Sequence, residues 1–459
     1  MPEHYDAVII GAGQAGPALA ERLGKVGMKT VIIERHLLGG TCVNVGCIPT
    51  KTLVGSARVA WLAREAAAFG VDVGGDVTVD MRRVKARKDE VAGASNAGVT
   101  AWIDGMENVS LIRGHARFTA PRAIEVDGVS LTAERVFINV GARARVPAFP
   151  GLEDIDYMTN SSMMEVDVLP QHLIVVGGSY IGLEFAQMYR RFGAQVTVVE
   201  MQDRLVGRED EDVSDAVREI LEGEGVTVRL DAECIGFEQG PLGVRMRIDC
   251  DEDATPIDAS HVLLAVGRVP NTHDLGLDLA GVNVDERGLI PVDDQLRTSA
   301  DGVWALGEVN GRGAFTHTAY NDFEIVAANL LDDDPRRVSD RINCYGLFID
   351  PPLGRVGMTE REVRESGRPA LIGTRQMTRV GRAREFGDTR GFIKILVDAQ
   401  TQELLGASIL GMSGDEAVHG LLDLMYAKQP YTVISRAVHI HPTVTELIPT
   451  VLQGLQPLE

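Results

Sequence analysis

Two stretches of the chain repeat the same order of apolar and polar positions. Residues Ala7–Glu34 pass from an apolar run through a glycine-rich turn and an amphipathic segment to a second apolar run that ends in glutamate. Residues Leu173–Glu200 do the same, with the same spacing from the first glycine of the turn to the final acid. Apolar runs that flank a segment of helical periodicity are typical of a strand, a helix and a second, parallel strand. The pattern therefore predicts two βαβ units.

Further segments extend this pattern. Residues Val136–Gly141 and Val262–Gly267 are apolar runs that end in glycine, and we expect the chain to cross between two domains at these points. Residues Thr298–Glu308 contain another apolar run that ends in Gly-Glu. Beyond about residue 340, alternating segments such as Gly391–Val397 predict an antiparallel sheet with helices packed against it. The expected fold class is α/β, with two Rossmann-like dinucleotide-binding domains followed by a C-terminal α+β domain.

The glycines of the first unit suit the binding of a dinucleotide. Gly11, Gly13 and Gly16 form a G-x-G-x-x-G pattern, which allows a tight turn, close approach of the backbone to a pyrophosphate and close packing of helix on strand. The N-terminus of the following helix then offers free N–H groups to the phosphates. Glu34 can accept hydrogen bonds from the hydroxyls of a ribose. One such motif is weak evidence, but two in the same context argue strongly against an incidental turn.

The second unit departs from the pattern at one position. Gly177 and Gly182 occupy the first and third glycine positions, whereas Ser179 occupies the second. Serine is small, so we expect a dinucleotide to bind here in a slightly displaced position. Glu200 favours NAD(H) over NADP(H), because its carboxylate would repel a 2′-phosphate. The nearby Arg204 leaves room for some use of NADPH.

The composition limits the classes of protein to which the chain can belong. With 459 residues, it is long enough for about three domains. Its net charge of −21 argues against nucleic acid or an anionic membrane surface as a partner. The chain starts without a charged leader, and no window approaches the roughly 18 apolar residues of a membrane span. We therefore expect a cytoplasmic enzyme.

The five cysteines are unevenly distributed. Cys42 and Cys47 lie five residues apart among glycines, whereas Cys234, Cys250 and Cys344 occur singly. An odd number of cysteines in a cytoplasmic protein argues against a framework of structural disulfides, so we expect the close pair to be catalytic or metal-binding. We interpret the other three as packing residues.

Three motifs, together with the two βαβ units, carry a resemblance to a known family. They are GGTCVNVGCIPTK at Gly39–Lys51, AVGRVPN at Ala265–Asn271 and HIHPTVTE at His439–Glu446. In combination they are specific, and over essentially the whole chain the sequence resembles the FAD-dependent pyridine nucleotide–disulfide oxidoreductases. The family includes dihydrolipoamide dehydrogenase, glutathione reductase, mercuric reductase and copper(II)-reducing flavoproteins.

The resemblance implies a division into domains and a set of cofactor contacts. Residues 1–143 and 269–340 would form the FAD-binding domain, residues 144–268 the NAD(P)-binding domain and residues 341–459 a dimerisation domain. NAD(P)H would bind at Gly177, Gly182 and Glu200. In the family, an aspartate at the position of Glu308 holds the ribityl chain of the flavin; the extra methylene of Glu308 is a departure from this pattern, and we still expect FAD to bind. The cofactor-binding residues expected in and around the FAD site are Gly11, Gly13, Gly16, Glu34, Gly40, Thr41, Lys51, Gly141, Gly267, Gly307 and Glu308.

The resemblance also implies the chemistry of the close thiol pair. Cys42 and Cys47 would form a reducible disulfide, with Cys47 facing the flavin and Cys42 attacking the substrate. Lys51 would lie near the flavin and pair with Glu184. A second set of catalytic residues, His441 and Glu446, would supply the base and acid for thiol exchange from the other subunit of a homodimer. No resident metal ion is implied.

The resemblance leaves the electron acceptor open. Glu200 and the His–Glu dyad favour dihydrolipoamide, free or on a lipoyl domain, as the dithiol substrate. The segments CVNVGCIPTKTLV and PPLGRVGMTE are closer to the branch that reduces metal ions or serves in oxidant defence, which is the alternative. Another small disulfide would use the same residues. A binding component of a multienzyme complex and a flavin oxidase that merely retains the cysteines are hypotheses of a different class.

Overall fold

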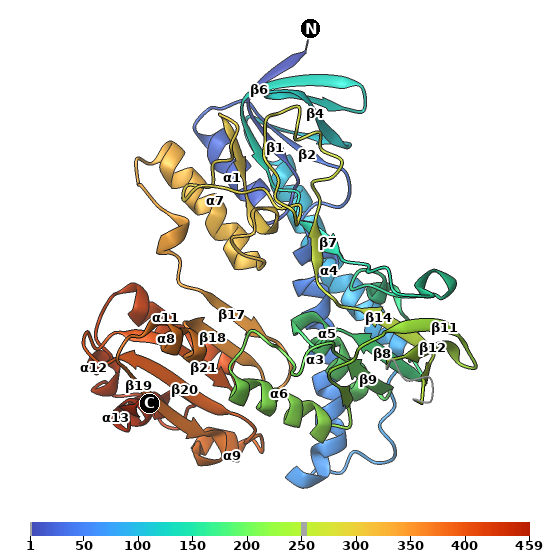
Figure 1. Cartoon of the computed structure of the whole chain (residues 1–459), viewed down its shortest axis with the longest axis vertical. Helices are drawn as coiled ribbons and strands as arrows, with labels where there is room; N and C mark the ends of the chain where they lie inside the picture. Colours follow the sequence, from blue (N-terminus) through green and yellow to red (C-terminus); the bar gives the residue numbers. More distant parts are fainter. Residues whose placement is uncertain (1, 249–254) are drawn as a thin grey trace.

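The first of three main sheets contains the N-terminal βαβ unit. The computed structural model describes residues 2–248 and 255–459. The sheet has the order β3-β2-β1-β6-β5-β4, with β16 paired in parallel to β6 (Figure 1, top). Its predicted β1, α1 and β2 are present, and the predicted run near residue 300 returns to the same sheet as β16. The strands are β1 (Glu3–Ile10), β2 (Thr30–Glu34), β3 (Val109–Arg113), β4 (Ala116–Ala120), β5 (Ala123–Val126), β6 (Val129–Ile138) and β16 (Val303–Ala305).

The second sheet contains the other βαβ unit. Its four strands are all parallel, in the order β10-β9-β8-β14, and a three-stranded antiparallel sheet lies beside it. The strands are β8 (His172–Val176), β9 (Gln195–Val199), β10 (Thr227–Arg229), β11 (Gly236–Gly240), β12 (Gly243–Arg247), β13 (Ile257–Ala259) and β14 (His261–Leu264). The two expected crossings between domains lie side by side, because β7 (Ala142–Ala144) pairs with β15 (Arg268–Pro270).

The third sheet is antiparallel, as the alternating pattern beyond residue 340 predicted. Its order is β17-β18-β21-β20-β19-β22. The strands are β17 (Cys344–Leu347), β18 (Leu353–Gly357), β19 (Ala370–Gln376), β20 (Phe392–Asp398), β21 (Leu404–Leu410) and β22 (Gln456–Pro457). Strand β20 is buried along its whole length, including Lys394, whose ammonium contacts Asp212 at 2.7 Å and Glu360 at 3.1 Å. The alternation therefore does not mark a solvent-exposed face.

Helices pack against these sheets and connect them. Helices α3 and α4 lie against each other, and α3 also packs on α5, so that they run from the first sheet toward the second (Figure 1). The helices are α1 (Ala15–Lys25), α2 (Gly40–Asn44), α3 (Cys47–Glu65), α4 (Met81–Asp104), α5 (Tyr180–Phe192), α6 (Glu211–Gly223), α7 (Thr316–Leu331), α8 (Glu360–Ser366), α9 (Gly381–Glu385), α10 (Gly414–Ala417), α11 (His419–Tyr426), α12 (Thr432–Ser435) and α13 (Ile448–Gln453). Short 3₁₀ turns are η1 (Ala66–Phe69), η2 (Leu152–Asp154), η3 (Ser162–Glu165), η4 (Gly307–Asn310), η5 (Val338–Asp340), η6 (Met377–Arg379) and η7 (Thr445–Leu447).

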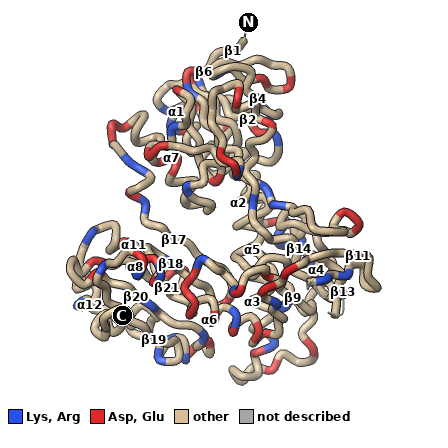
Figure 2. The backbone as a smooth tube through the Cα atoms, viewed as in Figure 1, with Lys and Arg blue, Asp and Glu red and all other residues tan. Residues whose placement is uncertain are grey.

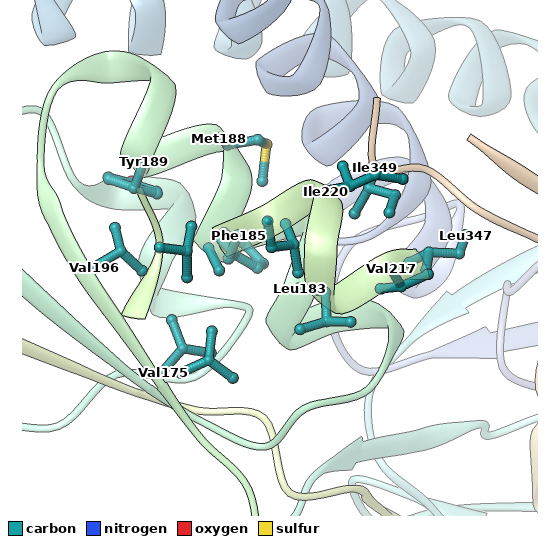
Figure 3. Packing of buried hydrophobic residues seen from close by; sticks show 14 of the residues in the cluster. Val175, Leu183, Phe185, Met188, Tyr189, Val196, Val217, Ile220, Leu347 and Ile349 are labelled. Carbon is teal, nitrogen blue, oxygen red and sulfur yellow. The ribbon is translucent and has the colours of Figure 1, made fainter. Parts of the chain in front are cut away.

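One apolar cluster joins all three parts of the molecule. Leu53 of α3 belongs to it. So do Phe185 of α5 and Val217 of α6, together with Leu347 and Ile349 from the start of the third sheet (Figure 3). All are nearly or fully buried. Burial of such a side chain contributes about 1.5–3 kcal/mol. The cluster therefore holds α3, which carries Cys47 at its first turn, against both neighbouring domains.

Cation–π contacts and ion pairs fix the C-terminal part of α3. Two guanidinium groups contact the Trp61 ring, with that of Arg191 at 4.8 Å and that of Arg390 at 5.3 Å from the ring centre. Both arginines pair with Glu224, at 2.6 Å and 2.8 Å. Arg191 also pairs with Asp350 at 2.6 Å. Cation–π contacts and buried ion pairs of this kind fix the direction of the helix relative to the second and third sheets.

The prediction that the three single cysteines are packing residues is wrong for Cys234, which is disulfide-bonded. Sequence spacing says nothing about which distant Cβ atoms approach within bonding range. Cys344 packs against the core of the third sheet, as expected. Cys250 lies outside the described residues. Among the described helices, none combines the length and the hydropathy needed to cross a bilayer.

Candidate active site

A large cavity of about 1410 Å³ opens between the three sheets. Typical small-molecule sites measure about 300–1,000 Å³, so this one suits an elongated ligand. Many of the predicted site residues line it: Gly11, Gly13, Glu34, Gly40, Thr41, Cys42, Cys47, Lys51, Gly141, Glu184, Gly307 and Glu308. The cavity thus runs from the first glycine turn to the thiol pair. The predicted residues that do not line it are Gly16, Gly177, Gly182, Glu200, Gly267, His441 and Glu446.

The first glycine turn is shaped for a ligand as well as for the fold. Gly11 has a φ of +105°, and a Cβ there would lie 2.3 Å from Asn139 O. A Cβ at Gly16 would lie 2.4 Å from Gly11 O. The fold itself therefore requires these two glycines. At Gly13 the nearest atom, Asn139 Nδ2, would be 3.4 Å away, so a side chain here would project mainly into the cavity. The missing Cβ at Gly13 leaves the space that a pyrophosphate needs, and the site fits FAD.

The two acidic residues make the same contacts in both βαβ units. Glu34 Oε2 accepts a hydrogen bond from Ala12 N at 2.8 Å, and its other oxygen accepts one at 2.8 Å from the amide two residues further on. Glu200 Oε2 accepts from Gly178 N at 2.6 Å, and its other oxygen accepts at 3.0 Å from the equivalent amide. Both carboxylates are thereby held at a strand end beside a glycine turn, where a ribose diol can reach them.

The second glycine turn repeats the geometry of the first. Gly177 has a φ of +114°, and a Cβ at Gly182 would lie 2.0 Å from Gly177 O. Ser179 replaces the middle glycine with a φ of −113°, which any residue adopts without strain. The turn therefore keeps its shape despite the departure from the pattern.

The two thiols lie at the start of a helix. Cys42 belongs to α2 and Cys47 is the first residue of α3, and both are free thiols in the structure. Their side chains are hydrogen-bonded to each other. Cys47 Sγ also lies 3.2 Å from Thr316 Oγ1, and Thr316 is the first residue of α7. The sulfur of Cys47 therefore faces the N-terminal ends of two helices, where a negative charge is stabilised.

The pKa values of the two thiols move in opposite directions. The hydrogen bond from Cys42, the Thr316 hydroxyl and the charge of Lys51 lower the pKa of Cys47 to about 6, against burial and the charge of Glu184. The hydrogen bond to Cys47, together with burial, raises the pKa of Cys42. At neutral pH, the reduced pair therefore holds a thiolate at Cys47 and a thiol at Cys42.

The expected ion pair of Lys51 and Glu184 is present. Lys51 Nζ lies 2.7 Å from Glu184 Oε2 and 4.6 Å from the centre of the Phe348 ring. Glu184 Oε1 accepts a hydrogen bond from Phe348 N at 3.1 Å. Lys51 is one helical turn after Cys47, so its charge is fixed close to the thiolate.

The His–Glu dyad is formed but lies away from the thiols of the same chain. His441 Nδ1 is 2.7 Å from Glu446 Oε2, and the His441 side chain is 78% exposed. Arg382 Nη2 donates to Pro442 O at 2.5 Å and so holds the segment that carries the histidine. Arg382 precedes the dyad by some sixty residues and no motif marks it, so it could not be predicted from the sequence.

Other residues that line the cavity were also absent from the set predicted from the sequence. Asn139 donates to Gly11 O at 3.1 Å, and Arg268 donates to Glu308 Oε1 at 2.7 Å. Arg268 lies within the AVGRVPN motif and Asn139 within the Val136–Gly141 run, so the sequence marked both segments, whereas no motif marked Thr316. Glu308 lines the cavity at the predicted position with its charge balanced by Arg268.

Comparison with known proteins agrees with this site. The model of the family "Pyridine nucleotide-disulphide oxidoreductase" matches residues 5–322, and that of its dimerisation domain matches residues 345–452. The chain belongs to this family. It is therefore a flavoprotein disulfide oxidoreductase that uses FAD and NAD(P)H and carries a dimerisation domain.

The relatives fall into more than one functional group. The probable pyridine nucleotide-disulfide oxidoreductase RclA of Escherichia coli is 36% identical over 96% of this chain and 97% of its own length. A dihydrolipoyl dehydrogenase of Thermus scotoductus is 33% identical, with 96% and 95% covered. A mercuric reductase of Staphylococcus aureus is 32% identical, with 90% and 76% covered. The structure of "HOCl-induced flavoprotein disulfide reductase RclA" superposes with a TM-score of 0.90 at 35% identity, covering 98% of this chain and 100% of that one.

The geometry of Gly13 predicts that Gly13→Ala lowers FAD retention without unfolding the chain. The added methyl group meets the protein only at 3.4 Å but occupies space facing the cavity. The flavin absorbance that remains after gel filtration should fall, while the far-ultraviolet circular dichroism spectrum stays unchanged. Gly55→Ala is the matched control, since nothing lies within 4 Å of a Cβ there. Full FAD retention by Gly13→Ala would contradict this account of the turn.

The thiol pair predicts a pH profile. In the anaerobically reduced enzyme, alkylation of Cys47 by iodoacetamide should rise with a midpoint near pH 6, because the thiolate is the reactive form. Mass spectrometry of the Cys47 peptide measures the rate at each pH. Thr316→Val should move the midpoint upward, since it removes a hydrogen bond that favours the thiolate. A wild-type midpoint near the ordinary value of 9.0 would contradict the assignment.

Proposed function

We propose that the protein passes electrons between NAD(H) and a small dithiol or disulfide through its Cys42–Cys47 pair. The observation that carries the proposal is the position of these two thiols at the wall of the cavity that fits FAD, with Cys47 at the first turn of α3 and 3.2 Å from the Thr316 hydroxyl at the start of α7. Thiol–disulfide exchange starts from a reduced pair in which one cysteine is a thiolate and the other is a thiol. When bound, FAD supplies the transfer of two electrons between the nicotinamide and the pair.

In the proposed exchange, each thiol has its own part. Cys42 gives up its proton and attacks one sulfur of the substrate disulfide, so that a mixed disulfide forms and the departing sulfur takes up a proton. The thiolate of Cys47 then attacks the sulfur of Cys42, which restores the Cys42–Cys47 disulfide and releases the second substrate thiol. Two electrons pass to the substrate in this sequence. The reverse sequence oxidises a dithiol.

The raised pKa of Cys42 means that a base must remove its proton. His441 suits this role, because Glu446 accepts from its Nδ1 and so orients the ring. The histidine is exposed and does not line the cavity of its own chain. Its position supports a homodimer in which the partner subunit's His441 serves Cys42.

The proposed preference for NADH rests on Glu200. Its carboxylate is fixed by two backbone amides at the end of β9, where it can bind a ribose diol and would repel a 2′-phosphate. Arg204 is paired with Asp203 at 3.1 Å, so the carboxylate of Asp203 partly neutralises the charge of Arg204. Both features favour NADH, and the arginine still allows weaker use of NADPH.

Dihydrolipoamide remains the first candidate for the dithiol. The His–Glu dyad, the NADH-type acid and the thiol pair all suit it, and dihydrolipoyl dehydrogenases are among the relatives at 33% identity. An oxidant-defence or metal-ion reductase is the second candidate. It is supported by the 36% identity to RclA, one structure of which is described as a Cu(II) complex. Among the described residues, no group of three or more potential ligands could hold a metal ion, so an ion would be met by the thiol pair as a substrate.

A side-by-side assay separates the candidates. One arm supplies NAD⁺ and dihydrolipoamide, and the other supplies NADH with Cu(II) or Hg(II) without oxygen. The proposal predicts rapid oxidation of dihydrolipoamide, lost in Cys42→Ser although FAD stays bound. His441→Ala should lower the rate by about 10²–10⁴-fold, as for loss of a general base. His4→Ala, at the far end of β1, is the control.

Each other outcome identifies a different function. Slow lipoamide turnover with rapid metal reduction would favour the second candidate. Oxidation of NADH by oxygen that is unaffected by Cys42→Ser would indicate an oxidase and contradict the proposal as a whole.

A further inference from the structure

Two charged side chains are fully buried at the junction of the second and third sheets, and nothing in the proposed chemistry uses them. Glu209 and Arg355 each have 0% side-chain exposure. Arg355 donates to Glu209 Oε2 from Nη2 at 2.6 Å and from Nε at 3.0 Å. Glu209 precedes α6 and Arg355 lies in β18, where acidic and basic segments adjoin (Figure 2). A buried ion pair is costly to form, so its retention calls for a role beyond stability.

The remaining oxygen of Glu209 holds a tyrosine at the cavity. Tyr345 of β17 donates its hydroxyl to Glu209 Oε1 at 2.6 Å. Tyr345 lines the cavity. Because Glu209 is fixed by two bonds from Arg355, the direction of the tyrosine ring is fixed as well.

The ring of Tyr345 packs against a residue next to the redox site. It stacks on Phe315 with 5.6 Å between ring centres and 16° between planes. His317 stacks on Phe315 at 5.5 Å and 8°. Tyr180 meets the edges of both Tyr345 and Phe315, at 5.5 Å and 6.1 Å. Phe315 is therefore held by three rings, of which only that of Tyr345 is anchored to a buried ion pair.

Phe315 leads directly to the thiol pair. It caps α7, and its backbone N–H donates to Thr318 Oγ1 at 3.1 Å. The next residue, Thr316, places its hydroxyl 3.2 Å from Cys47 Sγ. A shift of Phe315 would therefore move both the hydroxyl and the N-terminal end of α7 away from the sulfur.

We propose that Tyr345 is a positioning residue for the redox pair: the buried Glu209–Arg355 pair fixes its ring against Phe315, and this holds Thr316 at Cys47. The inference rests on the proposed role of Cys47 as the thiolate of the pair. The proposed chain of contacts begins at Glu209 in the second domain, passes through Tyr345 in the third domain and ends at Cys47 in the first domain.

The other groups that face Cys47 belong to elements other than β17 and α7. They are Cys42 of α2, Lys51 of α3 and Glu184 of α5. In the described part of the chain, Lys51 and Glu184 are hydrogen-bonded to each other and Glu184 also accepts from Phe348 N, so neither is hydrogen-bonded to Tyr345 or Phe315. A change in the acidity of Cys47 on substitution of Tyr345 therefore reports the position of the α7 end.

The test uses the FAD-loaded enzyme, reduced without oxygen, with the pH dependence of Cys47 alkylation as readout. Tyr345→Leu removes the stacked ring, and Tyr345→Phe removes only the bond to Glu209. Alkylation of Cys47 at pH 6 should be about fivefold slower in Tyr345→Leu, which corresponds to a midpoint about one pH unit higher than the wild-type midpoint near pH 6. Tyr345→Phe should shift in the same direction by less. Tyr157→Phe, on an exposed tyrosine of the second domain, should leave the profile unchanged.

The outcomes separate this inference from the proposed function. Wild-type profiles in both Tyr345 variants, with FAD retained, would overturn the inference. A shift in Tyr345→Leu alone would overturn the part assigned to the Glu209–Arg355 pair. If NADH does not convert a Cys42–Cys47 disulfide to two thiols in the wild-type enzyme, the proposed function itself fails, whatever the Tyr345 variants show.

Discussion

A negative charge on the sulfur of Cys47 is the feature on which the rest of the site depends. The sulfur can carry that charge near neutral pH because it faces the starts of α3 and α7, a thiol, a hydroxyl and the ammonium of Lys51. These groups come from separated parts of the chain. The apolar cluster around Phe185 and the charged groups around Trp61 bring them together by fixing α3 against two other domains. The packing of α3 against its neighbours is thus a condition for the acidity of Cys47.

The duplicated βαβ unit could be predicted from sequence because its requirements are local. A glycine at the first position is needed for its backbone angle, and one at the third for the contact of helix with strand. The acid at the end of the second strand has to bond the amide beside the first glycine. Each condition fixes one residue type at one spacing, so the same pattern is found twice. The thiol pair and the dyad were found from their motifs for a similar reason.

The parts that sequence analysis missed all join residues distant in the chain. Thr316 reaches Cys47 across 269 positions, and Tyr345 reaches Glu209 across 136. No periodicity or spacing reports such a contact. The same limit explains the error over Cys234, whose bonding depends on the positions of Cβ atoms rather than on the count of cysteines. The buried charges of Lys394 and Arg355 were also hidden, since a charged residue in a strand ordinarily indicates a solvated position.

The central claim is that the Cys42–Cys47 pair is a redox centre that shares electrons with FAD. Anaerobic titration with NADH, followed by flavin absorbance and by thiol content, tests it most directly. The account predicts that each subunit takes up two equivalents of NADH, one for the flavin and one for the disulfide, since each is a two-electron couple. Two thiols should become reactive with the first equivalent, and Cys42→Ser should take up one equivalent only. Complete reduction of the wild-type flavin by a single equivalent, with no new thiols, would contradict the account.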